Sequence, residues 1–170
     1  MKKATPRSRP AISIPRSNLE NALEIAYIIG ILAMIFALVR YWAALPDHVP
    51  TRFGAGGIPV AWGDKTALIR QLLVFVLISA GISALSRYPH LFNYPWRITG
   101  QNMRIQYQLA RTLLSWIKVE LIWLIGFTEW GSIQVALGRD HALRIEFLWA
   151  YMAIIFGTFA IYLYESFKAR

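Results

Sequence analysis

The chain has 170 residues, of which 56% are hydrophobic and 16% are charged, and this composition is too apolar for a small soluble domain. The sequence contains no cysteine, which excludes disulfides, iron–sulfur clusters, thiolate metal sites and covalently attached c-type haem. A net charge of +9 would favour nucleic-acid binding in a soluble protein. No basic stripe with stacking aromatic residues accompanies this charge, so we expect no nucleic-acid partner.

The first 18 residues are basic and contain Pro6, Pro10 and Pro15, so no helix can run through them. We expect a cytoplasmic arm that is either disordered and attracted to anionic lipid headgroups, or used to dock on a larger complex. Ser17 and Glu20 have the spacing of a capping box, which predicts that the first helix begins there.

Four apolar runs follow, and we predict that each is a transmembrane helix. The predicted spans cover residues 22–44, 67–86, 113–137 and 145–165. A helix needs about 20 mostly apolar residues to cross about 30 Å of hydrocarbon. Inside lipid every backbone polar group must be paired, which favours helices. We therefore predict an all-α fold, with residues 19–170 forming a single four-helix membrane domain that has an ordered outer loop and an amphipathic cytoplasmic helix.

The basic residues are distributed unequally between the two sides of such a bundle. Eleven lie on the side of the termini and the second loop: Lys2, Lys3, Arg7, Arg9, Arg16, Arg87, Arg97, Arg104, Arg111, Lys168 and Arg170. Six lie on the other side: Arg40, Arg52, Lys65, Arg70, Arg139 and Arg144. The positive-inside rule then places both termini in the cytoplasm. We expect the chain to be integral to a bacterial-type cytoplasmic membrane.

The loop between the first two spans is the longest stretch that is neither apolar nor plainly basic. Pro46 and Pro50 restrict their neighbours to extended geometry, while the glycines at 54, 56 and 57 permit a sharp reversal with positive φ. We expect Phe53 and Trp62 to fold back onto the helix ends, which would make the loop a lid. It serves either as a structural cap or as a recognition surface. The candidate lid or interaction residues are Pro46, Asp47, Pro50, Arg52, Phe53, Gly57, Trp62 and Lys65.

The ends of the remaining helices carry recognisable signals. Asp64 is expected to cap the second helix at its N-terminus. From residue 99 onward, polar and apolar residues fall on separate helical faces, which predicts an interfacial helix or a cytoplasmic extension of the third span. Gly138 suits a helix C-terminus and Asp140 the N-cap of the fourth helix.

The third span contains the candidate intramembrane polar residues Lys118, Glu120, Glu129 and Gln134. Lys118 and Glu129 lie almost on one line of the helix but about 16 Å apart, so they cannot pair directly. We expect Lys118 to extend its side chain to the cytoplasmic interface. Glu120 and Glu129 have three possible roles: internal hydrogen bonds, contact with a partner helix, or handling of a proton or cation.

Histidines are expected outside all four spans, which disfavours a bis-histidine haem or pigment at mid-membrane. His48, Asp47 and Asp64 share the outer loop, and His141 with Asp140 could meet them to form a metal site. This spacing matches no familiar site, and we predict neither a metal nor a cofactor.

The outer loop resembles the small membrane proteins grouped as domain of unknown function 1648. The matching residues are Leu45, Pro46, Asp47, Pro50, Phe53, Gly57, Trp62, Gly63 and Lys65. Arg52 replaces the family's histidine, and Val60 and Ala61 stand where an acidic residue is usual. The resemblance extends from the first span into the second. It implies an integral membrane protein, and some relatives, the SdpI-like proteins, act in immunity and signalling against a secreted toxin.

These features predict a non-catalytic integral membrane protein, either an accessory subunit of a larger membrane complex or an SdpI-like immunity and signalling protein. The sequence has no nucleophile–base pair, phosphate loop or HExxH-type site, so we do not expect an enzyme. The expected partners are membrane lipids and other integral membrane proteins, in a hetero-complex or a homo-oligomer. The alternative is a small proton- or ion-coupled transporter that uses the intramembrane carboxylates.

Overall fold

The computed structural model describes residues 9–170, which form four long helices, a β-hairpin and one short 3-10 turn. The helices are α1 (Asn18–Tyr41), α2 (Thr66–Leu85), α3 (Met103–Ala136) and α4 (Ile145–Lys168). Three of them, α1, α2 and α4, are long and apolar enough to cross a membrane. The longest helix, α3, is not one of these three, because charged and amide side chains along it lower its apolar character.

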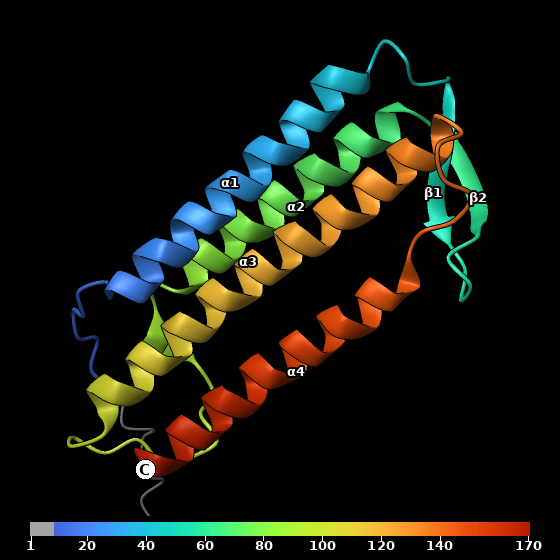
Figure 1. Ribbon diagram of the computed structural model, residues 1–170. Coiled ribbons are helices and arrows are strands. Elements are labelled where there is room, and N and C mark those ends of the chain that lie inside the picture. Colours follow the sequence, from blue (N-terminus) through green and yellow to red (C-terminus); the bar gives the residue numbers. More distant parts are fainter. Residues whose placement is uncertain (1–8) are drawn as a thin grey trace, which may run out of the picture.

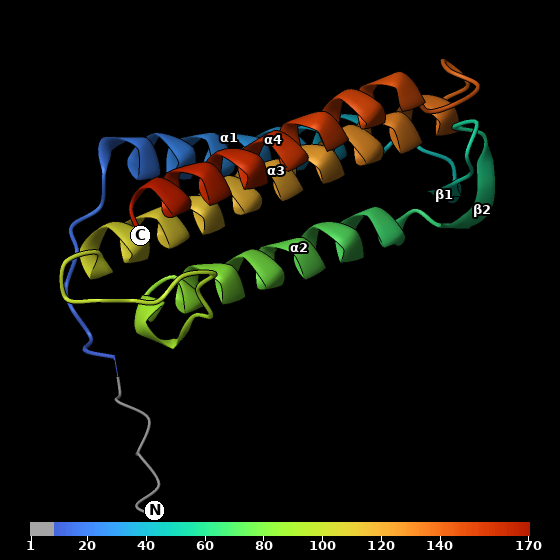
Figure 2. The ribbon, with the colours of Figure 1, turned by 90° about the horizontal axis from the view of Figure 1, so that it is seen from below.

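The four helices run alongside one another, with the hairpin at one end and the C-terminus at the other (Figure 1). Figure 2 shows that residues 9–17 also lie at the end opposite the hairpin. The central element is α3, which contacts α1, α2, α4 and the first hairpin strand. The hydrophobic core is formed mainly between α1, α2 and α3, and it contains Tyr27, Met34, Leu38, Leu68, Leu72, Ile122, Ile125 and Ile133.

The connection between α1 and α2 is a β-hairpin, so the all-α prediction is wrong for this segment. Strand β1 (His48–Phe53) pairs antiparallel with β2 (Pro59–Asp64), and the register shifts on both sides of Arg52. Gly57 has a φ of +72°, which allows the chain to reverse between the strands. Because the extended segment has no helical hydrogen bonds, its backbone groups pair across the hairpin instead.

The sequence signals at the helix ends are mostly confirmed. The Ser17 hydroxyl accepts from the Glu20 N–H at 3.1 Å, and the Ser17 N–H donates to the Glu20 carboxylate at 2.8 Å. The Asp64 carboxylate accepts from the Thr66 N–H at 2.8 Å, at the start of α2. The N-cap residue of α2 itself is Lys65, one position after the predicted Asp64. Hydrogen bonding to the Thr66 side chain, and then to the Thr66 N–H, lowers the pKa of Asp64 below its ordinary value of 3.8.

The end of α3 fits the prediction for Gly138 but not that for Asp140. Gly138 follows the helix with a φ of +68°. Asp140 does not cap α4, because α4 begins only at Ile145 and its N-cap residue is Arg144. The Asp140 N–H instead points back to the Gln134 carbonyl at 3.4 Å, so Asp140 belongs to the end of α3.

No separate interfacial helix precedes the third span among residues 9–170. The amphipathic segment is the first part of α3, which continues unbroken from Met103 to Ala136, as in the alternative of a helical extension. Residues 9–17 lie against this extension: Arg111 donates to the Ile14 carbonyl at 2.6 Å. The described part of the predicted arm, residues 9–17, thus contacts α3, and the rest of the arm, residues 1–8, lies outside the described residues.

Candidate functional site

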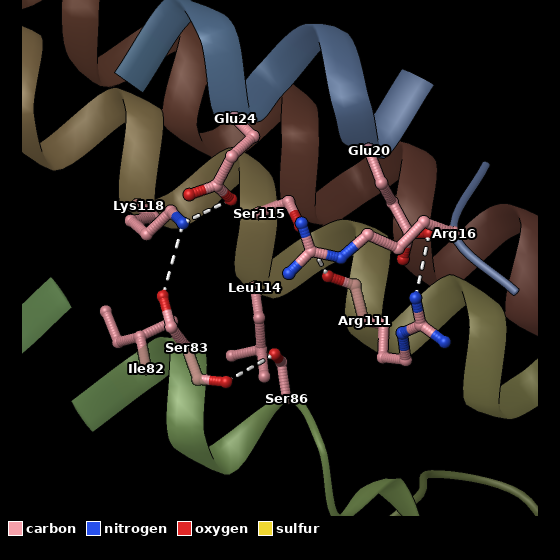
Figure 3. Close-up of a pocket in the computed structure, with 10 residues that line it drawn as sticks. All are labelled: Arg16, Glu20, Glu24, Ile82, Ser83, Ser86, Arg111, Leu114, Ser115 and Lys118. Carbon is pink, nitrogen blue, oxygen red and sulfur yellow. Dashed lines mark hydrogen bonds and ion pairs between the residues drawn. The ribbon is translucent and has the colours of Figure 1, made fainter. Parts of the chain in front are cut away.

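Two ion pairs join α1 to α3 at the end of the molecule that holds the termini. Glu24 contacts the Lys118 ammonium at 2.6 Å, and Glu20 contacts the Arg111 guanidinium at 3.1 Å (Figure 3). The two acids are four residues apart on α1 and the two bases seven apart on α3, so each pair of like residues shares one helical face. We call these four residues the ionic cluster.

Lys118 is buried, with only 5% of its side chain exposed. Besides Glu24, its ammonium donates to the Ser83 hydroxyl of α2 at 3.2 Å and lies 4.5 Å from the centre of the Tyr27 ring. These partners replace the water that the ammonium would find at an interface. The prediction that Lys118 extends to the interface is therefore wrong, and this side chain instead connects all three core helices.

A small cavity of about 30 Å³ lies beside the ionic cluster. Its lining is Arg16, Glu20, Glu24, Ile82, Ser83, Ser86, Arg111, Leu114, Ser115 and Lys118 (Figure 3). A cavity needs only about 10–15 Å³ of such space to hold one water molecule. The cavity can accommodate a water molecule that bridges the charged groups, but it is too small for an organic substrate.

Glu120 lies on the side of α3 that faces α4. Its carboxylate accepts from the Thr158 hydroxyl, and its backbone carbonyl accepts from the Tyr151 hydroxyl at 2.7 Å. A second contact between α3 and α4 is made by Gln106 and Ser166. The Ser166 hydroxyl donates to the Gln106 side-chain oxygen at 2.7 Å. Of the three roles considered for Glu120, the internal hydrogen bond is the one that this arrangement supplies.

Glu129 and Gln134 lie near the hairpin end of α3 and are almost fully buried, with 1% and 8% exposed. Within residues 9–170, neither carboxyl oxygen of Glu129 has a hydrogen-bond partner, and the Gln134 Nε2 also has none. Such groups are costly to bury and are uncommon in folded proteins. Glu129 is therefore the buried carboxyl group whose position internal hydrogen bonding does not explain.

One face of the hairpin closes the bundle. Val49 is fully buried, and β1 contacts α3. At the base of the hairpin the Lys65 N–H donates to the Asp47 carbonyl at 2.9 Å, and their side chains form an ion pair at 3.3 Å. The motif residues Asp47 and Lys65 thus hold the two ends of the hairpin together.

The hairpin turn is attached to the connection between α3 and α4. The Leu143 N–H donates to the Gly57 carbonyl at 2.7 Å. A Cβ placed on Gly57 would lie 2.0 Å from the Leu143 carbonyl oxygen, and one placed on Gly131 would lie 2.3 Å from Leu143 Cδ1. Both glycines therefore permit this close approach, and Gly57 in addition has the left-handed backbone conformation.

The other face of the hairpin points outward. Ile58, which directly precedes β2, and Val60 and Trp62 on β2 are 63%, 60% and 56% exposed. Val60 and Trp62 point to the same side, because alternate residues of a strand share one face. We call these three residues the outer face of the hairpin. The prediction that Trp62 folds back onto the helices is wrong, while Phe53 is half-buried. The remaining lid candidates Pro46, Asp47 and Arg52 are exposed, and Lys65 is half-buried.

The partners of Lys118 were not predicted from the sequence. Glu20 and Glu24 are acids four residues apart near the start of an otherwise apolar helix, and Arg111 precedes Lys118 by seven residues. That complementary spacing on two neighbouring helices was the available signal. The possible metal site does not form: no group of three His, Cys, Asp or Glu residues placed to hold a metal ion occurs in residues 9–170.

The structure is therefore that of a mainly helical protein. It has three helices long and apolar enough to cross a membrane, an internal ionic cluster and a β-hairpin at one end. Residues 28–73 match the family described as "Domain of unknown function (DUF1648)", which confirms the predicted family for this segment. The matching segment contains most of α1, the whole hairpin and the start of α2.

One similar protein is an "Uncharacterized protein" of Archaeoglobus fulgidus, which is 31% identical over 72 residues. The aligned region covers 38% of this chain and 39% of that protein, so well under half of either sequence is compared. No solved structure matches the chain.

Proposed function

We propose that the protein is a non-catalytic integral membrane protein that binds other membrane proteins, as an accessory subunit of a larger complex or in the SdpI-like manner. In this proposal all four helices cross the membrane and both termini lie in the cytoplasm. The hairpin then lies on the outer side, where its outer face contacts the partner.

The outer face of the hairpin is the observation on which the proposal rests. The fully buried Val49 and the contacts of β1 with α3 already close the bundle, whereas the large apolar side chain of Trp62 on β2 is left 56% exposed. Clustered exposed apolar residues in an ordered segment mark interaction sites, and tryptophan is enriched at the centres of such sites. In this proposal one hairpin serves both as the cap and as the recognition surface, which were alternatives from the sequence.

The polar groups of α3 are compatible with a fourth span, because several are paired inside the bundle. Lys118 is neutralised by Glu24, and Glu120 is bonded by α4. Charged residues inside a membrane are tolerated where they face the bundle interior and pair with each other. The most apolar stretch of α4 has no buried residue, which suits contact with lipid or with a partner helix.

A site-specific cross-linking experiment tests this proposal. A photoreactive benzoylphenylalanine replaces Trp62 in the full chain, and the cells are irradiated before the membranes are solubilised. We expect one discrete cross-linked product that contains a membrane protein. The same residue at the exposed turn position Ala55 is the matched control and should give much less product. Recovery of only the uncross-linked chain from both positions would contradict the proposal.

A small proton- or ion-coupled transporter is the second candidate, favoured by the carboxyl group of Glu129, which has no hydrogen-bond partner within residues 9–170. Intramembrane carboxyl groups that lack structural partners are typical of proton and cation pathways. In liposomes, this function predicts an ion flux that Glu129→Gln abolishes and Glu120→Gln retains. The absence of flux from the wild-type chain would exclude this candidate.

A further inference from the structure

A groove of about 320 Å³ lies between α1 and α3, on the hairpin side of the ionic cluster. Its floor includes Gly30 and Gly126, and its wall on α3 carries Trp123, Phe127 and Trp130. A Cβ on Gly30 would lie 3.0 Å from Ile122 Cγ2, which shows how closely the two helices approach. The volume is within the range of pockets that bind small organic molecules, which are mostly apolar with a few polar groups.

The aromatic wall of the groove is held in position. The Trp123 indole donates to the Ala26 carbonyl at 3.1 Å, which fixes its ring against α1. Trp130 packs edge-on against Tyr41, with ring centres 5.6 Å apart. Both indoles are nevertheless 42–44% exposed, so part of each ring remains open to a ligand. Tryptophan is the side chain that attracts organic cations most strongly.

Glu129 borders the same groove. Helical side chains lean toward the helix N-terminus, so its carboxyl group lies over the turn that contains Gly126, where a side chain is missing. The residue that faces Gly126 is Met34, whose Cγ would lie 3.4 Å from an added Cβ. Met34 also lines the groove, and a methionine side chain is flexible enough to adapt its shape to a ligand.

We propose that this groove binds small organic cations with an apolar or aromatic body, with Glu129 as the counter-charge and Trp123 and Trp130 as the walls. The proposal joins two independent observations: a buried carboxyl group without a partner in residues 9–170, and an aromatic-lined groove of ligand size beside it. An aromatic wall and a carboxylate attract the same kind of ligand, because both favour positive charge. The inference goes beyond the interaction function and does not involve the hairpin.

Binding of a matched pair of probes to the solubilised full chain tests this site by isothermal titration. The cation is benzyltrimethylammonium, and the control is neopentylbenzene, which has the same shape without the charge. We expect the cation to bind at least about tenfold more tightly than the neutral probe. Glu129→Gln should remove this preference, because neutralising one member of a desolvated charge pair weakens binding strongly.

Two further variants separate the site from general effects on folding. Glu120→Gln makes the same change at a buried glutamate that faces α4, and it should leave the affinity for the cation within about twofold of the wild type. Ala33→Leu fills the groove from an exposed position of α1 and should weaken both probes about tenfold or more. Equal affinity of the wild type for the two probes would overturn the proposal, as would a Glu129→Gln variant that binds the cation normally.

Discussion

Replacing Lys118 by methionine tests whether the ionic cluster stabilises the fold. Methionine keeps much of the length and apolar character of the side chain but removes the ammonium group. Glu24 then loses its ion-pair partner and Ser83 loses a hydrogen-bond donor. A lysine that merely extended to an interface would tolerate this change with an effect within about 0.5 kcal/mol.

The expected magnitude follows from the burial of the two partners. Removing one member of a fully buried ion pair costs about 3–5 kcal/mol, because the other charge stays buried without compensation. Lys118 is 5% exposed, but the Glu24 side chain is 33% exposed and water can screen part of its charge. We therefore expect Lys118→Met to lower the free energy of unfolding by about 1–3 kcal/mol.

A double-mutant cycle in detergent, measured by thermal and denaturant unfolding, isolates the contribution of the pair. Glu24→Gln is the second member of the cycle, since it removes the stranded charge. The double variant should be more stable than the sum of the two single losses predicts, by about 1 kcal/mol or more. A coupling energy below about 0.3 kcal/mol would refute the reasoning and would return Lys118 to an interfacial role.

Three other variants test separate parts of the fold. Gly57→Ala should detach the hairpin turn from the connection between α3 and α4. A residue with a Cβ in the left-handed conformation costs about 1–2 kcal/mol, and this Cβ would lie 2.0 Å from the Leu143 carbonyl oxygen. Faster proteolysis at the hairpin is the expected result. Asp64→Ala should lower the melting temperature at neutral pH, because a carboxylate whose pKa is lowered by folding stabilises the fold above pH 3.8. The difference in melting temperature between variant and wild type should disappear as the pH falls below 3.8. Ser166→Ala should lower the free energy of unfolding by about 1–3 kcal/mol, because it removes the hydroxyl donor to the buried Gln106 side-chain oxygen. An unchanged melting temperature would show that this hydrogen bond does not stabilise the contact between α3 and α4.

Features encoded in neighbouring residues were predictable from the sequence. The capping box at Ser17 and the reversal at Gly138 are confirmed, because each depends on a few adjacent positions. Asp64 accepts the predicted kind of hydrogen bond at the start of α2, but it lies one residue before the N-cap Lys65. The apolar runs located the helices for a similar reason. The Asp140 prediction failed because the link continues to Arg144, and its Leu143 bonds to the hairpin turn before α4 begins.

Features that depend on contacts between distant residues were not predictable from these patterns. Lys118 pairs with a residue 94 positions earlier, and only the packing of α1 against α3 brings the two together. Glu120 and Glu129 look alike in the sequence, yet one is bonded by α4 and the other has no partner in the described chain. The hairpin was predicted as a loop without strands, because its prolines and glycines favour turns and its two strands are short.

Labelling a single cysteine at position 55 tests the central claim most directly. The position is exposed at the hairpin turn, and the absence of natural cysteines means that the wild-type chain provides an unlabelled control. With the hairpin outside, an impermeant maleimide should label the Ala55→Cys variant on intact cells as completely as in broken ones. Labelling that requires the membrane to be opened would place the hairpin in the cytoplasm and contradict the proposed orientation.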